Sequence, residues 1–407
     1  METNALFAAA LGLTDPWFVA AIDLDPVAKR LEIQLDFRRG GTFACPECAT
    51  AGCKAHDTAD RRWRHLDFFQ FRTELVARIP RVDCERCGVH PATVPWARPG
   101  SGFTLLFEAL VLAMAPQMPV AAIGRLVDEH DTRLWRLLQY HVDDARRRRK
   151  DRKVRAIGID ETSSRKGQQY ITLFVDLERS QLLFATPGKD ASTVTRFRED
   201  FVAHGGRPTH VEELCCDMSA AFLKGVAEAF PGVPVTLDRF HLVQLVNEAV
   251  DLTRRAERTA APELKGQRYA FLRNPETMTD QQLGFVAEQL ERSRTLKTVR
   301  AFHLKLVFLE VFTQPRRAAA GYLDRWCRWA QRSRLPEMVR VAQTIRERWD
   351  GVLRWFTSHI SNGVLEGINS VIQAAKAKAR GYRNVENLIT MAYLIAGHLR
   401  FDVPAFR

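Results

Sequence analysis

The segment that decides the fold opens with Val154-Arg-Ala-Ile-Gly-Ile-Asp160, a short β-rich run. Side chains alternate across a strand, so Ile157 and Ile159 point to one side and Asp160 points to the other. Two more β-rich runs follow, separated by turn residues, and strand and helix patterns then alternate. The predicted strands are 154–160, 169–177, 181–186, 211–216 and 233–237, and the predicted helices are 192–203 and 219–230.

This order, βββαβαβ, is that of the RNase H-like fold, and carboxylates stand where a site would form. Asp160 lies in the first strand and Asp217 ends the fourth, so the two are predicted to be adjacent across the sheet. A third carboxylate, Glu366, lies on a predicted helix that opens at Ser361, a residue suited to capping, and stops at Gly381. This helix has an apolar face and a polar stripe. The stripe consists of Asn362, Glu366, Asn369, Gln373, Lys376 and Arg380.

Three carboxylates in this arrangement can hold two divalent ions, and Mg²⁺ suits an all-oxygen site. One ion would activate water or a 3′-hydroxyl, and the other would stabilise the leaving oxygen during attack on phosphorus. Plainer interpretations stay open. Glu161 is a rival to Asp160 for the first position. Asp217 could cap the helix that starts near Ser219, and Glu366 could be a solvated helix residue.

The cysteines predict a metal centre before this segment. Four of the eight fall in two Cys-x₂-Cys pairs, namely Cys45, Cys48, Cys84 and Cys87. Two such pairs present four thiolates in tight turns, which suits structural Zn²⁺ better than a disulfide. Cys53 and His56 form a Cys-x₂-His pair that could join or shift this ligand set. Between the pairs, alternate residues from Phe69 to Ile79 share one face, so residues 1–100 are predicted to be a zinc-binding β module.

Helical periodicity then replaces the strand pattern. The runs 120–126 and 132–140, joined by a short polar turn, fit a helix-turn-helix, although an ordinary three-helix bundle fits as well. The run 146–153 holds seven basic residues in eight and is predicted to be a linker that also contacts phosphates, so that residues 101–153 form a DNA-binding region. Candidate DNA contacts are Arg133, Arg136, Arg146, Arg147, Arg148 and Arg149, with Lys376 and Arg380 near the third carboxylate.

The charge predicts a polyanionic partner. The 407 residues include 60 Lys+Arg and 48 Asp+Glu, a formal net charge of +12, which favours double-stranded DNA. The net charge is +3 for residues 1–153, −3 for 154–250, +8 for 251–350 and +4 for 351–407. We therefore predict a cation-binding core in 154–250 that is completed by 351–407. Residues 251–350 are predicted to be an all-helical insertion whose arginines hold DNA.

The sequence predicts no membrane segment. The most apolar stretch, residues 103–126, is interrupted by Glu108, Pro116 and Pro119, so no run of about 20 apolar residues exists. Residues 1–13 have no basic lead-in and too short an apolar run for a signal peptide. We therefore expect a cytoplasmic protein that associates with the nucleoid when it binds DNA.

These features together resemble the DDE transposases of bacterial insertion sequences, in the family often called the ISL-three type. The likeness covers essentially the whole chain, including the cysteine pairs and the helix-turn-helix. Its most specific motifs are Ile-Gly-Ile-Asp160-Glu, Asp217 after a strand, Asp238-Arg-Phe-His241, Ser361-Asn-Gly-Val-Leu-Glu366-Gly-Ile-Asn369 and Lys-Ala-Arg380-Gly-Tyr-Arg383. The resemblance implies that Asp160, Asp217 and Glu366 are a catalytic triad that cleaves DNA at inverted repeats and joins the 3′-hydroxyl to target DNA. It also implies a homodimer or higher oligomer on the paired ends.

Asp238 and His241 are predicted to be supporting residues. Asp238 is expected to cap the helix that follows it, with His241 packed or hydrogen-bonded nearby. Mutator-type and hAT transposases carry a similar Asp-x₂-His signature. Two other functions fit the same sequence. A catalytically inactive zinc and helix-turn-helix regulator would bind DNA without cleaving it, and a hydrolytic nuclease would cleave without strand transfer.

Overall fold

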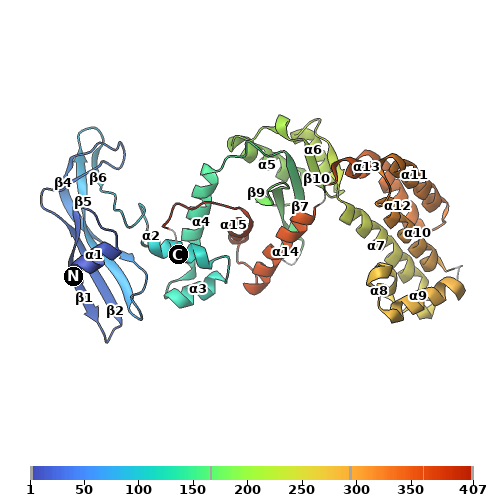
Figure 1. The fold of residues 1–407 in the computed structure, drawn as a ribbon, viewed down its shortest axis with the longest axis horizontal. Helices are drawn as coiled ribbons and strands as arrows, with labels where there is room; N and C mark the ends of the chain where they lie inside the picture. The colour runs from blue at the N-terminus through green and yellow to red at the C-terminus, as the bar shows by residue number, and fades with distance from the viewer. Residues whose placement is uncertain (1–2, 166, 293–295, 361, 405–407) are drawn as a thin grey trace. The chain divides into compact units, whose positions relative to one another are not determined.

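A computed structural model describes residues 3–165, 167–292, 296–360 and 362–404 (Figure 1). The chain forms two compact units, one from residues 1–145 with 400–407 and one from residues 146–399. The fold is mixed α/β, with a small β module, a group of helices, and a mixed sheet that is interrupted by a helical insertion. Within the described residues, none of the helices combines the length and the apolar character that a membrane span requires.

The first unit begins with helix α1 (Thr3–Ala10) and a six-stranded sheet of order β1-β2-β5-β4-β3, with β6 paired to β5. The strands are β1 (Trp17–Asp25), β2 (Arg30–Phe37), β3 (Thr42–Phe43), β4 (Cys53–Arg64), β5 (Arg72–Cys84) and β6 (Gly88–Pro91). The predicted alternation holds along β5, where Thr73, Leu75 and Ala77 are buried. It is wrong at Phe69, which is 80% exposed with a φ of 53°, because the chain turns there before β5 begins.

Three helices complete the first unit: α2 (Leu105–Met114), α3 (Val120–Val127) and α4 (Asp131–Arg148). The turn between α3 and α4 has no glycine, and Asp128 takes the left-handed conformation there with a φ of 51°. A glycine is needed one turn earlier instead. A β-carbon at Gly124 would lie 2.7 Å from the carbonyl oxygen of Glu129, so only glycine lets the turn fold back this closely onto α3.

The second unit is built on a five-stranded sheet of order β11-β10-β7-β8-β9. The strands are β7 (Ala156–Arg165), β8 (Gln169–Asp176), β9 (Gln181–Pro187), β10 (Glu213–Cys216) and β11 (Val235–Leu237), and helices α5 (Ala191–Ala203) and α6 (Ala220–Ala229) precede β10 and β11. The first three strands are antiparallel, whereas β10 and β11 run parallel to β7. Phe174, Phe197 and Phe222 anchor the core between the sheet and these helices. The predicted RNase H-like fold is confirmed.

The helical insertion follows β11 and has its own core, which includes Phe308, Leu323 and Trp326. Its helices are α7 (Arg239–Glu257), α8 (Arg268–Leu272), α9 (Asp280–Arg292), α10 (Lys297–Val311), α11 (Arg316–Arg332), α12 (Pro336–Glu347) and α13 (Trp349–Ser358). One of its many arginines is not available to a partner. Arg254 is buried, and its Nη2 lies 2.7 Å from Asp251 Oδ1.

Two last helices return the chain to the sheet. These are α14 (Gly363–Lys378) and α15 (Val385–Ala396), which pack against β7 and β9 respectively (Figure 1). All five strands of the sheet precede the insertion, and two of the helices that cover the sheet follow it. Candidate residues far apart in sequence meet on β7 for this reason.

Candidate active site and zinc centre

Strands β7 and β10 bring the first two candidate carboxylates to neighbouring positions. The parallel register pairs Glu213 with Ala156 and Cys215 with Gly158. Continuing this register by two residues sets Asp217, which directly follows β10, level with Asp160 on β7. Neighbouring strands are about 4.8 Å apart, so the two residues lie on adjacent strands at the same height of the sheet.

Helix α14 runs along the face of β7 that carries Asp160. At its start, Leu365 covers Gly158, where an added β-carbon would lie 2.3 Å from Leu365 Cδ1. One turn later, Asn369 Nδ2 donates to Asp160 Oδ2 at 2.6 Å. Contacts between α14 and β7 repeat at this interval because four helix residues advance about 6.0 Å and two strand residues advance about 6.6 Å. Gly158 therefore determines how closely α14 approaches the candidate site.

Further along α14, the polar stripe binds the end of β7 rather than solvent. Gln373 Nε2 donates to Thr162 Oγ1 at 2.6 Å and to the Ser163 carbonyl at 2.9 Å. Lys376 Nζ donates to the same carbonyl at 2.5 Å, and burial lowers the pKa of Lys376. In this structure the ammonium group of Lys376 fastens the helix to the strand, and its contact with DNA stays a prediction.

Glu366 lies in the first turn of α14, one residue after Leu365 and one turn before Asn369. Its side chain is exposed, so the carboxylate is accessible to a ligand. The predicted cap, Ser361, lies outside the described residues, and Asn362 is the residue at the N-cap position. The helix ends at Lys378, three residues before Gly381, whose amide donates to the Lys376 carbonyl at 2.8 Å.

Asp160 lies in a strongly acidic environment. It is only 9% exposed, and burial raises its pKa to about 6, with further upward contributions from Asp217 and Asp238. The amide of Glu161 and the nearby His241 oppose this rise. A carboxylate held among other carboxylates in this way gains most from a bound cation. Oxygen donors of this kind fit Mg²⁺.

Asp238 accepts hydrogen bonds at the N-termini of two helices, α7 and α14. It is the N-cap of α7, as predicted, because its side chain accepts from the Phe240 amide at 3.3 Å. Its Oδ1 also lies 3.4 Å from the amide nitrogen of Asn362, the residue that begins α14. His241 Nε2 is 3.9 Å from the other oxygen, Oδ2, which has no hydrogen-bond partner among the described residues. Asp238 therefore helps to place the helix that carries Glu366.

The four predicted zinc ligands meet in the first unit. Atoms Sγ of Cys45, Cys48, Cys84 and Cys87 all lie within 4.8 Å of one another. Hydrogen bonds from Thr50 lower the pKa of Cys48 to about 6, which favours the thiolate that binds metal. Among the described residues this is the only group of three or more potential metal ligands gathered so tightly, and the carboxylates of the second unit are more widely spaced. Its composition and spacing fit structural Zn²⁺.

The other cysteine and histidine considered for this centre do not join it. The thiol of Cys53 is buried and lies 3.5 Å from the Thr50 carbonyl oxygen. His56 is exposed on β4. The sulfurs gathered in the structure are therefore those of the two Cys-x₂-Cys pairs, without Cys53 or His56.

The candidate DNA contacts differ in their availability. On α4, Arg136 is exposed, and Arg133 is half exposed, paired with Glu129 and stacked over Phe103 with a centroid distance of 4.4 Å. Arg147, Arg148 and Arg380 are exposed as well.

Two residues of the basic run contradict the linker prediction. Arg146 Nη2 lies 2.7 Å from Asp200 Oδ1, and its guanidinium stacks over the ring of Tyr393. Arg149 is 8% exposed, and its Nη2 lies 2.8 Å from Asp151 Oδ2. Helix α4 continues to Arg148 instead of ending before the run. Arginine combines a charge with a flat stacking surface, so these two residues bind the core in this structure, and a role in phosphate contact stays a prediction.

Comparison with known proteins agrees with this arrangement. A family model described as "Transposase", for the DDE domain of ISL3, matches residues 157–392, which is more than half of the chain. The chain belongs to the ISL3 family of transposases. Two further models of ISL3-type transposases match it, the helix-turn-helix domain at residues 92–142 and the zinc-finger at residues 41–87. The predicted helix-turn-helix is thereby confirmed against the plain three-helix bundle.

Individual ISL3-type relatives cover nearly the same length. The transposase for insertion sequence element IS1557 of Mycobacterium tuberculosis is 30% identical over 374 residues, which cover 83% of this chain and 82% of the relative. The transposase for IS1001 of Bordetella parapertussis is 26% identical over 386 residues, covering 91% and 90%. The family therefore accounts for most of the chain and supports a DNA-binding transposase.

Sequence reasoning missed two residues that shape this ISL3-type core. Gly158 was passed over, although a glycine between two isoleucines in a strand often marks a close approach by another element. Asn369 was recognised only as part of a polar stripe, and its bond to Asp160 required the position of α14. The pairing of Asp238 with Asn362 had no signal in the sequence, because the residues are 124 positions apart.

Proposed function

We propose that this protein is a DNA transposase that binds the inverted repeats of an insertion sequence and carries out Mg²⁺-dependent cleavage and strand transfer. Asp160, Asp217 and Glu366 are the proposed catalytic residues. The observation that carries this proposal is the docking of α14 on the Asp160 face of β7, through the 2.6 Å bond from Asn369. That contact supports the proposal that Glu366, three residues earlier on α14, acts together with the two strand carboxylates.

The same three residues would hold the two Mg²⁺ ions. When bound, these ions supply activation of the attacking oxygen and neutralisation of charge at phosphorus. Asn369 orients Asp160 by donating to Oδ2, while the amide of Glu161 donates to Oδ1. Asp238 holds the beginning of α14, and thus the height of Glu366 above the sheet. The buried position of Asp160 limits its contact with bulk water, which strengthens its attraction for a cation.

DNA binding is assigned to exposed basic residues outside the triad. Arg136 on α4 is the strongest candidate for contact with the inverted repeat, since it is exposed on the second helix of the helix-turn-helix. Arg133, Arg147, Arg148 and Arg380 are proposed to support it by contacting phosphates. Pairing of two ends by a dimer or a higher oligomer is part of the proposal.

The test uses the full-length protein, Mg²⁺ and a duplex that carries the inverted repeats flanking the gene. We expect nicked ends with 3′-hydroxyl groups and products in which these ends are joined to target DNA. Cleavage without any joined product would indicate the nuclease alternative. Tight binding with no cleavage by the wild-type protein would indicate the inactive regulator.

Replacing Asn369 by alanine should slow cleavage by roughly 10- to 100-fold, the usual cost of losing a residue that orients a metal ligand. Loss of the donor also raises the pKa of Asp160, so the acid limb of the pH–rate profile should move to higher pH. The matched variant is Gln373→Ala, which removes bonds from α14 to β7 without touching a carboxylate. An equal shift of the acid limb in both variants would mean that Asn369 acts only by holding the helix.

A further inference from the structure

The second unit has another charged feature, at the edge where β7 and β10 begin. Two hollows, of about 620 and 640 Å³, share Arg152 and His210 in their linings. We call their basic residues the basic pocket, which consists of Arg152, Lys153, Arg155, Arg179, Arg207 and His210. The segment 154–250 has a net charge of −3, so this edge is basic within a domain that is acidic as a whole.

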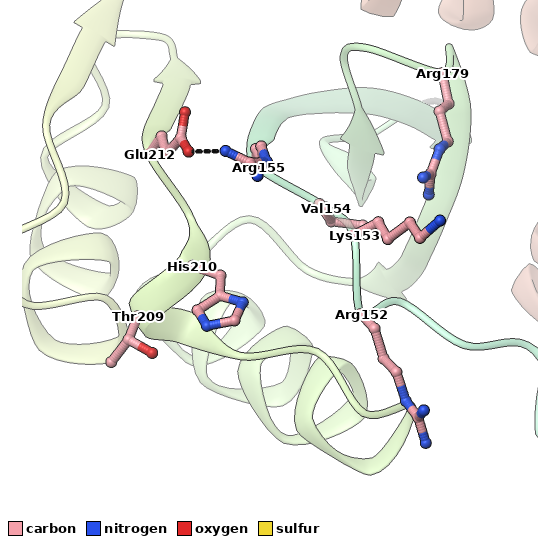
Figure 2. A pocket seen from close by; sticks show the side chains of 8 residues that line it. All are labelled: Arg152, Lys153, Val154, Arg155, Arg179, Thr209, His210 and Glu212. Carbon is pink, nitrogen blue, oxygen red and sulfur yellow. Dashed lines mark hydrogen bonds and ion pairs between the residues drawn. The ribbon is translucent and has the colours of Figure 1, made fainter.

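The basic residues of the pocket come from separate parts of the chain. Lys153 and Arg155 lead into β7, Arg179 lies in the β8–β9 turn, and His210 precedes β10. Figure 2 shows the charged ends of Lys153 and Arg179 pointing toward one another and Arg155 reaching toward Glu212. Two cations held face to face repel each other until an anion lies between them.

Few carboxylates neutralise this cluster. Glu212 is the one acidic residue among the described residues that line the hollows, and it pairs with Arg155 where both are exposed. Arg179 lies 3.7 Å from a carboxylate oxygen of buried Asp176. In the described part of the chain, Arg152, Lys153 and Arg207 are exposed and have no ion-pair partner. Net positive charge therefore remains available to a ligand.

The basic pocket lies away from the candidate active site. On β7, Arg155 directly precedes the strand and Asp160 comes five residues after Arg155. On β10, Glu212 directly precedes the strand and Asp217 comes five residues after Glu212. Five residues of strand span about 16 Å. Ligands of open α/β sheets bind at the carboxyl ends of the strands, whereas the basic pocket is at the amino ends. It is a separate site.

We propose that the basic pocket binds phosphates of the double-stranded DNA backbone, independently of base sequence. This inference rests on the proposed function of a DNA-processing enzyme. The site would hold a DNA segment at the edge of the catalytic core opposite the carboxylates. It adds a contact surface to the helix-turn-helix and to the helical insertion, which the distribution of charge along the sequence had suggested for DNA.

The chemistry of the lining favours a DNA backbone over a free nucleotide or small phosphate. Among the described residues, the lining contains no Phe, Tyr or Trp on which a base could stack and no Asn or Gln to read a base edge. The cations are exposed along two open hollows instead of surrounding one enclosed point. Such a surface suits a chain of phosphates, and contacts of this kind position DNA without reading its sequence.

The test measures duplex binding as a function of salt, without added Mg²⁺, in protein carrying Asp160→Asn so that cleavage plays no part. The pocket variant is Arg152→Gln with Lys153→Gln and Arg179→Gln. Each lost phosphate contact lowers the slope of log K against log[salt] by about 0.9, so the slope should fall by roughly 2 to 3. Affinity at 0.1 M salt should fall by at least about tenfold, equally for inverted-repeat and random duplexes.

The control variant removes three exposed cations elsewhere in the unit and changes the net charge equally. Its substitutions are Arg196→Gln and Arg198→Gln on α5 and Lys224→Gln on α6. We expect its slope to change much less than that of the pocket variant. An equal change in both variants would mean that net charge, and not this pocket, governs binding.

A variant that binds duplex DNA more tightly than the wild type cannot owe its changed binding to misfolding. Glu212→Gln frees Arg155 and should steepen the salt slope by about 0.9. In a separate arm, inorganic pyrophosphate is titrated into the wild-type protein. Saturable pyrophosphate binding at the pocket, with no effect of the pocket variant on duplex binding, would overturn the assignment to DNA. Absence of cleavage activity in the wild-type protein would bear on the proposed function alone.

Discussion

Replacing Asp160 by asparagine is expected to abolish DNA cleavage and strand transfer, with a loss of at least about 10³-fold. Metal-bound carboxylates contribute several kcal/mol to the stabilisation of charge at phosphorus. At 1.36 kcal/mol for each factor of ten, about 4 kcal/mol corresponds to this loss. The measurement is cleavage of an inverted-repeat duplex in Mg²⁺ by wild-type and variant protein. Binding of the same duplex should change little, because the DNA contacts lie on other residues.

The comparison variant is Glu161→Gln, which carries the same charge change one residue further along β7. Glu161 is the other carboxylate that the strand pattern leaves as a rival, and its amide donates to Asp160 Oδ1 at 2.8 Å. We expect the Glu161→Gln variant to retain most of its activity. An active Asp160→Asn protein beside an inactive Glu161→Gln protein would falsify the assignment of the first carboxylate.

Thermal unfolding of the metal-free protein is the check that the Asp160→Asn variant is folded. The pKa of Asp160 is raised to about 6 in the fold, above the unfolded value near 4. Proton binding to Asp160 therefore stabilises the fold below about pH 4, and this contribution is lost as the pH rises through 6. Above pH 6 the variant should be more stable than the wild type by roughly 1–3 kcal/mol. Added Mg²⁺ should stabilise the wild type and leave the variant almost unchanged.

Loss of a zinc ligand is expected to unfold the N-terminal module. Structural Zn²⁺ contributes roughly 10–16 kcal/mol of apparent binding energy in small domains, which is far more than such a module retains from its core alone. Cys84 is buried at the end of β5, and its sulfur lies 3.7 Å from that of Cys48. The Cys84→Ser protein should contain much less zinc, lose the near-ultraviolet signal of the module's buried tryptophans and become sensitive to protease before residue 100.

Cys53→Ser provides the matched control for this experiment. Cys53 is also buried in the module, but its sulfur faces the Thr50 carbonyl and stands outside the ligand group. We expect one zinc per chain in the wild type and in the Cys53→Ser variant. Full zinc content in Cys84→Ser together with loss in Cys53→Ser would mean that the ligand set includes Cys53.

Local patterns predicted the elements of the catalytic core well because each pattern depends on neighbours in the sequence. Strand β7 was recognised from alternating isoleucines, and the four zinc ligands from the spacing within two short turns. The same local reasoning did not predict the core contacts of Arg146 within the basic run, since nothing near Arg146 in the sequence indicates Asp200 or Tyr393. It also extended the alternation of β5 to Phe69, where a turn interrupts the strand.

The sequence by itself determined the order of strands and helices, the metal-binding cysteines and the three carboxylates that fit a two-metal site. These properties follow from side-chain chemistry and from the periods of strands and helices. Only the tertiary structure decided which polar residues serve the site and which basic residues stay available to DNA. Asn369 meets Asp160 across 209 residues, and Arg152, Arg179 and His210 meet at one edge of the sheet. Such meetings depend on how α14 and the strands pack, because packing joins residues that no local pattern relates.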